Sequence, residues 1–183
     1  MKDLSLYILD IAMNSVRAGA KHIEILLEED ANAVLTLTIR DDGCGMSEEQ
    51  VSRLFDPFFT TRKTRGVGLG IPFLQMLAQQ TGGDVTVASK SEQEYADHGT
   101  VVTAVFHTDH IDFIPMGDLT ESILTLIQGS PDVDFIYRHT TPSGSVTMDT
   151  AEMRSVLGDD ISLASYEVLG FIKAYLQEQY QQF

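Results

Sequence analysis

Residues 3–18 constrain the fold most, because their apolar side chains leave almost no polar side to a helix. A helix that is apolar around most of its circumference is buried in a protein core. Asp10 and Asn14 nevertheless lie four positions apart within it, and Arg17 follows three positions later, so all three fall on one face. Burying a carboxylate and an amide without partners costs about 2 kcal/mol or more. We therefore expect this face to meet a ligand or a polar network.

Strands and short helices are predicted to follow this buried helix. Residues 23–27 and 35–39 alternate apolar and polar side chains, which indicates two half-buried strands, and the DANA sequence between them predicts a hairpin. Ser47 and Gln50 form a capping-box pattern that begins a short helix. Pro72 is compatible only with the first turn of the next helix, IPFLQMLAQQTGG, and the segments GDVTVAS and GTVVTAVFHT predict two more strands.

The character of the chain changes after about residue 110. The segment DLTESILTLIQG predicts a helix, DVDFIYRH and SVTMDT predict a second hairpin, and SYEVLGFIKAYLQEQYQQF predicts a final amphipathic helix. We therefore interpret residues 1–109 as one domain and residues 110–183 as a small α/β domain of unknown role. The 183 residues allow one ordinary domain with such an appendage.

The sequence RDDGCGM, residues 40–46, follows the second strand directly. Taken alone it is compatible with a metal loop, a redox site, a plain turn or part of a nucleotide pocket. Cys44 is the only cysteine of the chain and has no pattern of metal ligands around it. We therefore expect Cys44 to be a small neutral side chain that fills space in the loop. We interpret Asp42 as an exposed residue of a turn.

Four segments in a fixed order carry a resemblance to a known family. They are Asp10-x-x-x-Asn14, Asp41-x-Gly43-x-Gly45, Phe55-x-x-Phe58-Phe59 and Gly66-x-Gly68-x-Gly70. With the strands between them, residues 1 to about 107 resemble the ATP-binding domain of the GHKL superfamily, which includes histidine kinases, anti-sigma-factor kinases and mismatch-repair ATPases. NSVRAGA and RDDGCGM look most like the mismatch-repair members, whereas FDPFFTT and GVGLGIPF look most like histidine kinases.

This resemblance implies an α+β fold, a two-layer α/β sandwich of the Bergerat type with a small C-terminal α/β appendage. It also implies that Asp41 accepts a hydrogen bond from the exocyclic amine of adenine, and that Thr100 helps Asp41 to hold the base. The three phenylalanines are expected to serve as hinge and packing for the loop over ATP. The implied ATP-binding residues are Asn14, Arg17, Asp41, Gly43, Gly45, Met46, Arg62, Lys63, Gly66, Val67, Gly68, Leu69, Gly70 and Thr100.

The phosphates are expected where glycines open a helix, because unobstructed amides and the helix dipole favour anions. Arg62, Lys63 and Arg65 place three cations within four positions of a strongly acidic chain, although a solvated basic loop is the alternative reading. Asn14 resembles the magnesium ligand of the family, and a neutral oxygen suits a hard cation. Arg17 lies where histidine kinases carry a basic residue near the phosphates.

Asp10 occupies the position of the family's general base, which is usually a glutamate in the hydrolytic branches. Aspartate is one methylene shorter, so Asp10 either activates water or an acceptor, or only orients Asn14 and the metal's water shell. His139 is expected at a β-hairpin rather than on a helical phosphoacceptor hairpin, so we interpret it as structural or surface.

The preferred function is magnesium-dependent phosphoryl transfer from ATP to a partner protein in trans, as in histidine kinases. It is favoured by Arg17 and by the short TTRKTR segment between Phe59 and Gly66. Two alternatives remain: an ATP-hydrolysing conformational switch of the mismatch-repair type, and a non-catalytic ATP-binding regulatory module.

The formal net charge of -15 opposes binding to nucleic acid or to an anionic membrane. The chain shows no signal-peptide pattern and no apolar run of about 20 residues. We therefore expect a cytoplasmic protein with a protein partner as phosphoacceptor or regulator; homodimerisation is left open as an alternative to a monomer.

Overall fold

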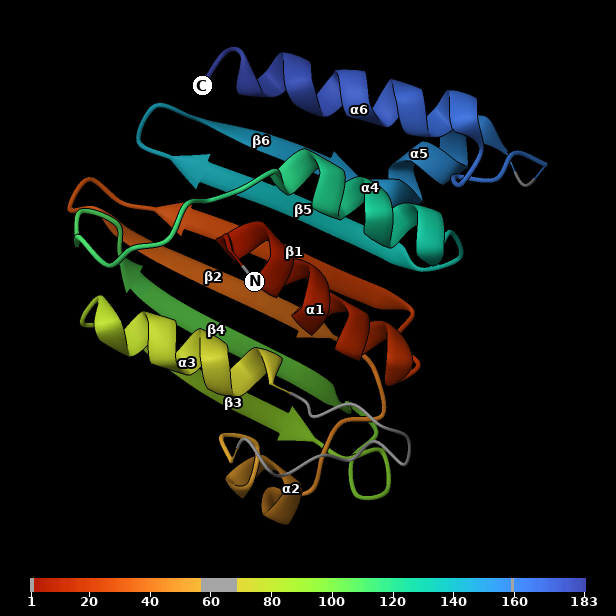
Figure 1. Ribbon diagram of the computed structural model, residues 1–183. Coiled ribbons are helices and arrows are strands. Elements are labelled where there is room, and N and C mark those ends of the chain that lie inside the picture. Colours follow the sequence, from red (N-terminus) through yellow and green to blue (C-terminus); the bar gives the residue numbers. More distant parts are fainter. Residues whose placement is uncertain (1, 57–68, 159) are drawn as a thin grey trace.

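The computed structural model describes residues 2–56, 69–158 and 160–183. Within these ranges, one mixed sheet is covered by a layer of helices (Figure 1). The elements in chain order are α1 (Leu4–Arg17), β1 (His22–Glu29), β2 (Val34–Asp41), α2 (Glu48–Ser52), α3 (Gly70–Gln80), β3 (Asp84–Lys90), β4 (Gly99–His107), α4 (Leu119–Gly129), β5 (Asp134–Thr141), β6 (Gly144–Asp149), α5 (Thr150–Leu157) and α6 (Tyr166–Tyr180).

The sheet has six strands in the order β3-β4-β2-β1-β5-β6. All neighbouring strands are antiparallel except β1 and β5, which are parallel. The two predicted hairpins, β1–β2 and β5–β6, are confirmed, and so is the predicted α+β architecture. The register places Asp41 at the end of β2 opposite Ile23 of β1 on one side and Thr100 of β4 on the other.

Helix α1 lies at the centre of the helical layer, between α3 and α4 (Figure 1). Its side chains Leu4, Ile8, Ile11 and Ala12 are buried in the main core, as its apolar sequence predicts. Its N-terminus is capped by the Asp3 carboxylate, which accepts from the backbone N–H of Leu6. α1 is therefore held on several sides, and its polar face is fixed toward the end of the sheet where β2 ends.

The segment after residue 110 extends the same sheet, because β5 pairs with β1 along most of that strand. Phe135 and Tyr137 of β5 belong to the same buried core as the β1 residues Ile23 and Ile25. Helix α5 was not predicted from the sequence; Asp149 caps its first turn. The division into residues 1–109 and 110–183 as separate folding units stays a prediction.

Strand β6 forms one edge of the sheet, and α6 covers that edge. The Gln179 side chain donates to the Thr147 carbonyl at 3.0 Å and accepts from the Thr147 N–H at 2.9 Å. It thereby occupies backbone groups that another strand could pair with. No helix in the described part of the chain is long and apolar enough to span a membrane.

Candidate functional site

The Asp41 carboxylate is fixed by hydrogen bonds to both of its oxygens. Ser15 of α1 donates from its hydroxyl to Oδ2 at 2.6 Å, and the Gly43 N–H donates to Oδ1 at 2.9 Å. Ser15 is buried, whereas Asp41 is half-buried. Each carboxylate oxygen can accept about two hydrogen bonds, so Asp41 still has acceptor capacity for a ligand. Ser15 was not identified from the sequence, although it follows Asn14 directly.

Thr100 lies opposite Asp41 and belongs to a second polar cluster centred on Ser89 of β3. The Ser89 hydroxyl lies 2.8 Å from the Thr100 hydroxyl and 3.0 Å from the Gly99 carbonyl, and it accepts from the Met46 N–H at 2.9 Å. Ser89 was missed as a site residue. Alternation along β3 places Ser89 on the same face as the buried Val85. This alternation identifies Ser89 as a site residue only when the register of β3 with β4 is known.

The proton positions in this cluster follow from the partners. The Ser89 hydroxyl has one proton, which can go to the Gly99 carbonyl or to the Thr100 oxygen, and we assign it to Gly99, which can only accept. Met46 donates to one lone pair of the Ser89 oxygen, so the Thr100 contact is a donation from Thr100 to Ser89. Thr100 has then used its only proton. Both Asp41 and Thr100 can therefore offer only acceptors to a ligand.

The glycines of the 40–46 loop permit close backbone contacts. Gly45 has a φ of +65°, and a Cβ built there would lie 1.8 Å from the Lys90 carbonyl oxygen. A Cβ on Gly43 would lie 2.9 Å from the Ala18 Cβ. Both positions therefore need glycine. The loop is thus pinned between α1 and the end of β3.

Cys44 and Asp42 anchor the same loop to its surroundings. The Cys44 N–H donates to the Ala18 carbonyl at 2.9 Å, and its thiol is half-buried. Asp42 accepts from the N–H groups of Lys21 and His22 at 2.7 and 2.9 Å. Partial burial opposes ionisation of Asp42, but these backbone donors outweigh it and lower the pKa of the carboxyl. Asp42 thus holds the start of β1 rather than standing in an open turn.

Asp10 and Asn14 also lie on α1, on the N-terminal side of Ser15. The Arg17 guanidinium donates to the Asn14 Oδ1 at 2.9 Å. A Cβ built on Gly70 would lie 2.2 Å from the Asp10 Oδ2, so the carboxylate of Asp10 lies against the first residue of α3. Helices α1 and α3 therefore meet where the first residue of the Asp10–Asn14 motif contacts the last residue of the glycine motif. Leu69, just before α3, is half-buried.

Several predicted site residues lie outside the described residues: Arg62, Lys63, Gly66, Val67 and Gly68. Phe58 and Phe59 of the aromatic motif also lie outside them. Phe55 is described and packs, partly buried, against the main core, in agreement with a packing role. Pro72 lies in the first turn of α3, as predicted.

A cavity of about 710 Å³ opens beside the two polar clusters. Asp41, Ser89 and Thr100 all line it, and α2 contributes Val51 and Ser52. Asp10, Asn14 and Arg17 are not among its lining residues. The structure thus brings the base-reading residues of the prediction together in one hollow, and it places the α1 residues next to α3.

The fit to magnesium rests on oxygen atoms of α1. Among the residues that the structure describes, no group of three or more histidine, cysteine, aspartate or glutamate side chains could hold a metal ion by itself. Asn14 and Asp10 offer a neutral and an anionic oxygen on one helix face. Such a partial set suits magnesium, which commonly takes its other ligands from phosphates and water.

The chain belongs to the family described as "Histidine kinase-, DNA gyrase B-, and HSP90-like ATPase", whose sequence profile matches residues 2–110. The tetrathionate sensor histidine kinase TtrS of Salmonella typhimurium is 34% identical over 97 residues, which is 53% of this chain and 16% of that protein. The signal transduction histidine-protein kinase AtoS of Escherichia coli is 36% identical over 89 residues, 49% of this chain and 14% of its own length. The chain thus spans less than a fifth of either kinase.

Solved structures confirm the fold. The ATPase domain of Aquifex aeolicus MutL, solved with ADP, superposes with a TM-score of 0.54 at 14% identity and covers 86% of this chain and 69% of that one. At such identity the likeness concerns the fold alone. It extends beyond the segment matched by the family profile, and the predicted resemblance to the GHKL superfamily is confirmed.

The close approach at Gly45 predicts a large effect of a single methyl group. Gly45→Ala is expected to lower the free energy of unfolding by about 2–4 kcal/mol, because the new Cβ meets the Lys90 carbonyl in a left-handed conformation. Gly129→Ala is the control, since a Cβ there meets nothing within 4 Å. Urea unfolding measures both variants, and equal stabilities would contradict the loop geometry.

Proposed function

We propose that the chain binds magnesium-ATP and transfers the γ-phosphoryl group to a partner protein in trans. The observation that carries the proposal is the pair of acceptors formed by Asp41 and Thr100 at the edge of one cavity. Membership of an ATPase family supports nucleotide binding, and the named kinases among the relatives support transfer to a protein.

The two acceptors suit adenine. The exocyclic amine of adenine carries N–H donors, whereas guanine has a carbonyl oxygen at the same ring position. An oxygen of guanine would face the Asp41 carboxylate and the Thr100 oxygen without a proton between them. Buried polar groups left unpaired in this way disfavour a ligand by about 1–3 kcal/mol. The site therefore selects ATP over GTP.

The phosphate end is assigned to the polar face of α1 and to the start of α3. Asn14 offers its oxygen to magnesium, while Arg17, whose side chain is exposed, can turn from Asn14 to a phosphate. Magnesium, when bound, offsets the charge of the phosphate oxygens during transfer. Asp10 orients Asn14 or the acceptor from its position against Gly70. Arg62 and Lys63 remain proposed phosphate contacts on the sequence alone.

The proposal of an acceptor on another protein rests on the relatives that are named as histidine kinases, and His139 of the chain itself is far from Asp41. His139 lies on β5 opposite Leu27 of β1, whereas Asp41 lies opposite Ile23, so the two residues are four positions apart along β1. At about 3.3 Å per residue this amounts to about 13 Å along the sheet. His139 is also only 4% exposed.

Incubation with γ-labelled ATP tests the transfer. We expect label to appear on a second protein when the chain is mixed with extract of its source cells, and not on the chain alone. The label should be lost on treatment with acid if the acceptor is a histidine. Release of free phosphate without labelled protein would contradict the kinase assignment and favour the hydrolytic switch, and intact ATP in both mixtures would favour the binding module.

The proton assignment around Ser89 generates a second prediction. Ser89→Ala removes the acceptor for the Thr100 proton, so the Thr100 hydroxyl becomes free to rotate and to donate to guanine. We expect the ratio of GTP to ATP dissociation constants to fall about tenfold, with ATP itself still bound.

Ser52→Ala is the matched control for Ser89→Ala. Ser52 lines the same cavity, but its hydroxyl donates to the Glu49 carbonyl within α2. Its removal is expected to leave the nucleotide preference unchanged. Calorimetric titration of both variants with ATP and GTP decides the matter: a preference that stays the same in Ser89→Ala contradicts the assigned role.

A further inference from the structure

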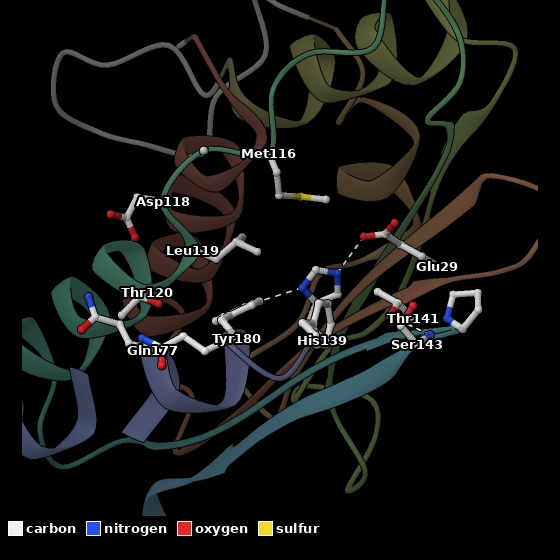
Figure 2. A pocket seen from close by; sticks show the side chains of 14 residues that line it. Glu29, Met116, Asp118, Leu119, Thr120, His139, Thr141, Ser143, Gln177 and Tyr180 are labelled. Atoms are coloured by element: carbon white, nitrogen blue, oxygen red, sulfur yellow. Dashed lines mark hydrogen bonds and ion pairs between the residues drawn. The ribbon is translucent and has the colours of Figure 1, made fainter. Parts of the chain in front are cut away.

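A second cavity, of about 1110 Å³, lies at the other end of the sheet from Asp41. Its walls are the segment leading into α4, the last turn of α6 and the turn between β5 and β6 (Figure 2). None of the predicted site residues within the described ranges lines it. The lining residues on which the inference rests are Glu29, Met116, Asp118, Leu119, His139 and Phe183.

His139 forms the floor of this cavity and joins two parts of the chain. Its Nε2 lies 2.8 Å from the Glu29 Oε1, and its Nδ1 lies 3.0 Å from the Tyr180 hydroxyl (Figure 2). The Tyr180 hydroxyl in turn lies 2.5 Å from that of Tyr137. Because Glu29 can only accept, the His139 Nε2–H must donate to it. The carboxylate of Glu29 is thereby held in place at the cavity.

The charge of the cavity comes from carboxylates. Burial raises the pKa of Tyr180 to about 12, and it also raises the pKa of Tyr137, so both hydroxyls stay neutral at physiological pH. Glu29 and Asp118 line the cavity, whereas the described lining includes no lysine or arginine. Asp118 also caps α4 by accepting from the Glu121 N–H. An anionic ligand would therefore meet net negative charge.

Glu29 is accessible to a ligand, unlike the histidine that holds it. Its side chain is 28% exposed, whereas that of His139 is 5% exposed. Apolar surface lies close by, from Met116, Leu119 and Phe183, and the Phe183 ring lies 5.1 Å from the His139 ring between centroids. Carboxylate next to aromatic and aliphatic surface is the combination that binds an ammonium group with an apolar body.

We propose that this cavity is a second ligand site, which binds a small organic cation with its ammonium group at Glu29 and its apolar part against Met116, Leu119 and Phe183. The site is independent of the proposed nucleotide site, since no residue in the described part of the chain lines both cavities. Its specificity rests on the sign of the ligand's charge, which a pair of probes with similar bodies can test.

The probes are 2-phenylethylammonium and 3-phenylpropionate, which share a phenyl ring on a short chain and differ in charge. Titration of the full chain, followed by the backbone amide signals in NMR, should show saturable shifts at residues 116–120 and 139–143 for the ammonium probe. The carboxylate probe should bind at least about tenfold more weakly, because it meets two carboxylates. Equal binding of both probes, shifts confined to other residues, or no saturable binding of the ammonium probe would overturn the proposal.

Two variants distinguish a direct contact between the ligand and Glu29 from the general effect of removing one negative charge. Glu29→Gln keeps an oxygen that can accept from His139 but removes the charge, and is expected to weaken the ammonium probe about fivefold. Glu28→Gln is the control, because Glu28 is exposed and points to the opposite face of β1; it should leave binding unchanged. Equal effects of the two variants would overturn the assignment.

If Glu29→Gln does not fold, Asp118→Asn replaces it, because asparagine caps a helix about as well as aspartate. This variant removes the second carboxylate of the cavity and should weaken the ammonium probe while the amide spectrum stays native. Unchanged binding in a folded Asp118→Asn would count against a site that selects cations by its carboxylates.

Discussion

The hydrogen bond from Ser15 to Asp41 depends on how α1 is buried, and the proposed nucleotide site depends on that bond. A helix that is apolar on most sides must be covered by the sheet below and by neighbouring helices. In this chain α3 and α4 flank it. The polar residues in the last turn of α1 lie at the end of the sheet where β2 stops. There Ser15 fixes the carboxylate that would read the base, and Asn14 lies one residue away.

The same helix connects the two ends of the molecule. Its first N–H groups, those of Leu4 and Ser5, donate to the carbonyls of Pro115 and Met116 at 2.9 Å. Met116 lines the second cavity. The C-terminal half of α1 carries Asn14 and Ser15, and the carbonyl of Ala18, just beyond it, accepts from Cys44 in the glycine loop. No described residue of α1 lines either cavity, but α1 supports both: its first turn holds the segment of Met116, and its Ser15 holds Asp41.

Much of the fold could be predicted because its signals are local. The apolar helix, the alternating strands and the capping box from Ser47 to Gln50 each depend on residues within one element, and all three are confirmed. The parallel pairing of β5 with β1 could not be predicted, since it joins residues more than 100 positions apart. Helix α5 was missed because it is short: its eight residues present only Met153 and Leu157, four positions apart, to the core, and Asp149 caps its first turn.

For the candidate site too, local signals could be predicted from the sequence and long-range ones could not. Asp41, Gly43 and Gly45 were recognisable because motif residues lie close together in sequence. Ser89 was not, because its role comes from lying opposite Thr100 across two strands, and strand register is set by long-range packing. The roles of Arg62, Lys63 and the glycines at 66 and 68 stay predictions. The cavity around Glu29 and His139 left no sequence signal, since its walls come from four separate elements.

The most direct measurement is the ATP affinity of Asp41→Asn beside that of Asp42→Asn. Both changes remove one carboxylate from adjacent positions, but Asp41 faces the cavity, whereas Asp42 holds the backbone of Lys21 and His22. If Asp41 grips the adenine amine, calorimetry will show ATP binding weakened about a hundredfold in Asp41→Asn and by no more than about threefold in Asp42→Asn. Wild-type affinity in Asp41→Asn, in a chain that still unfolds cooperatively, would contradict the account.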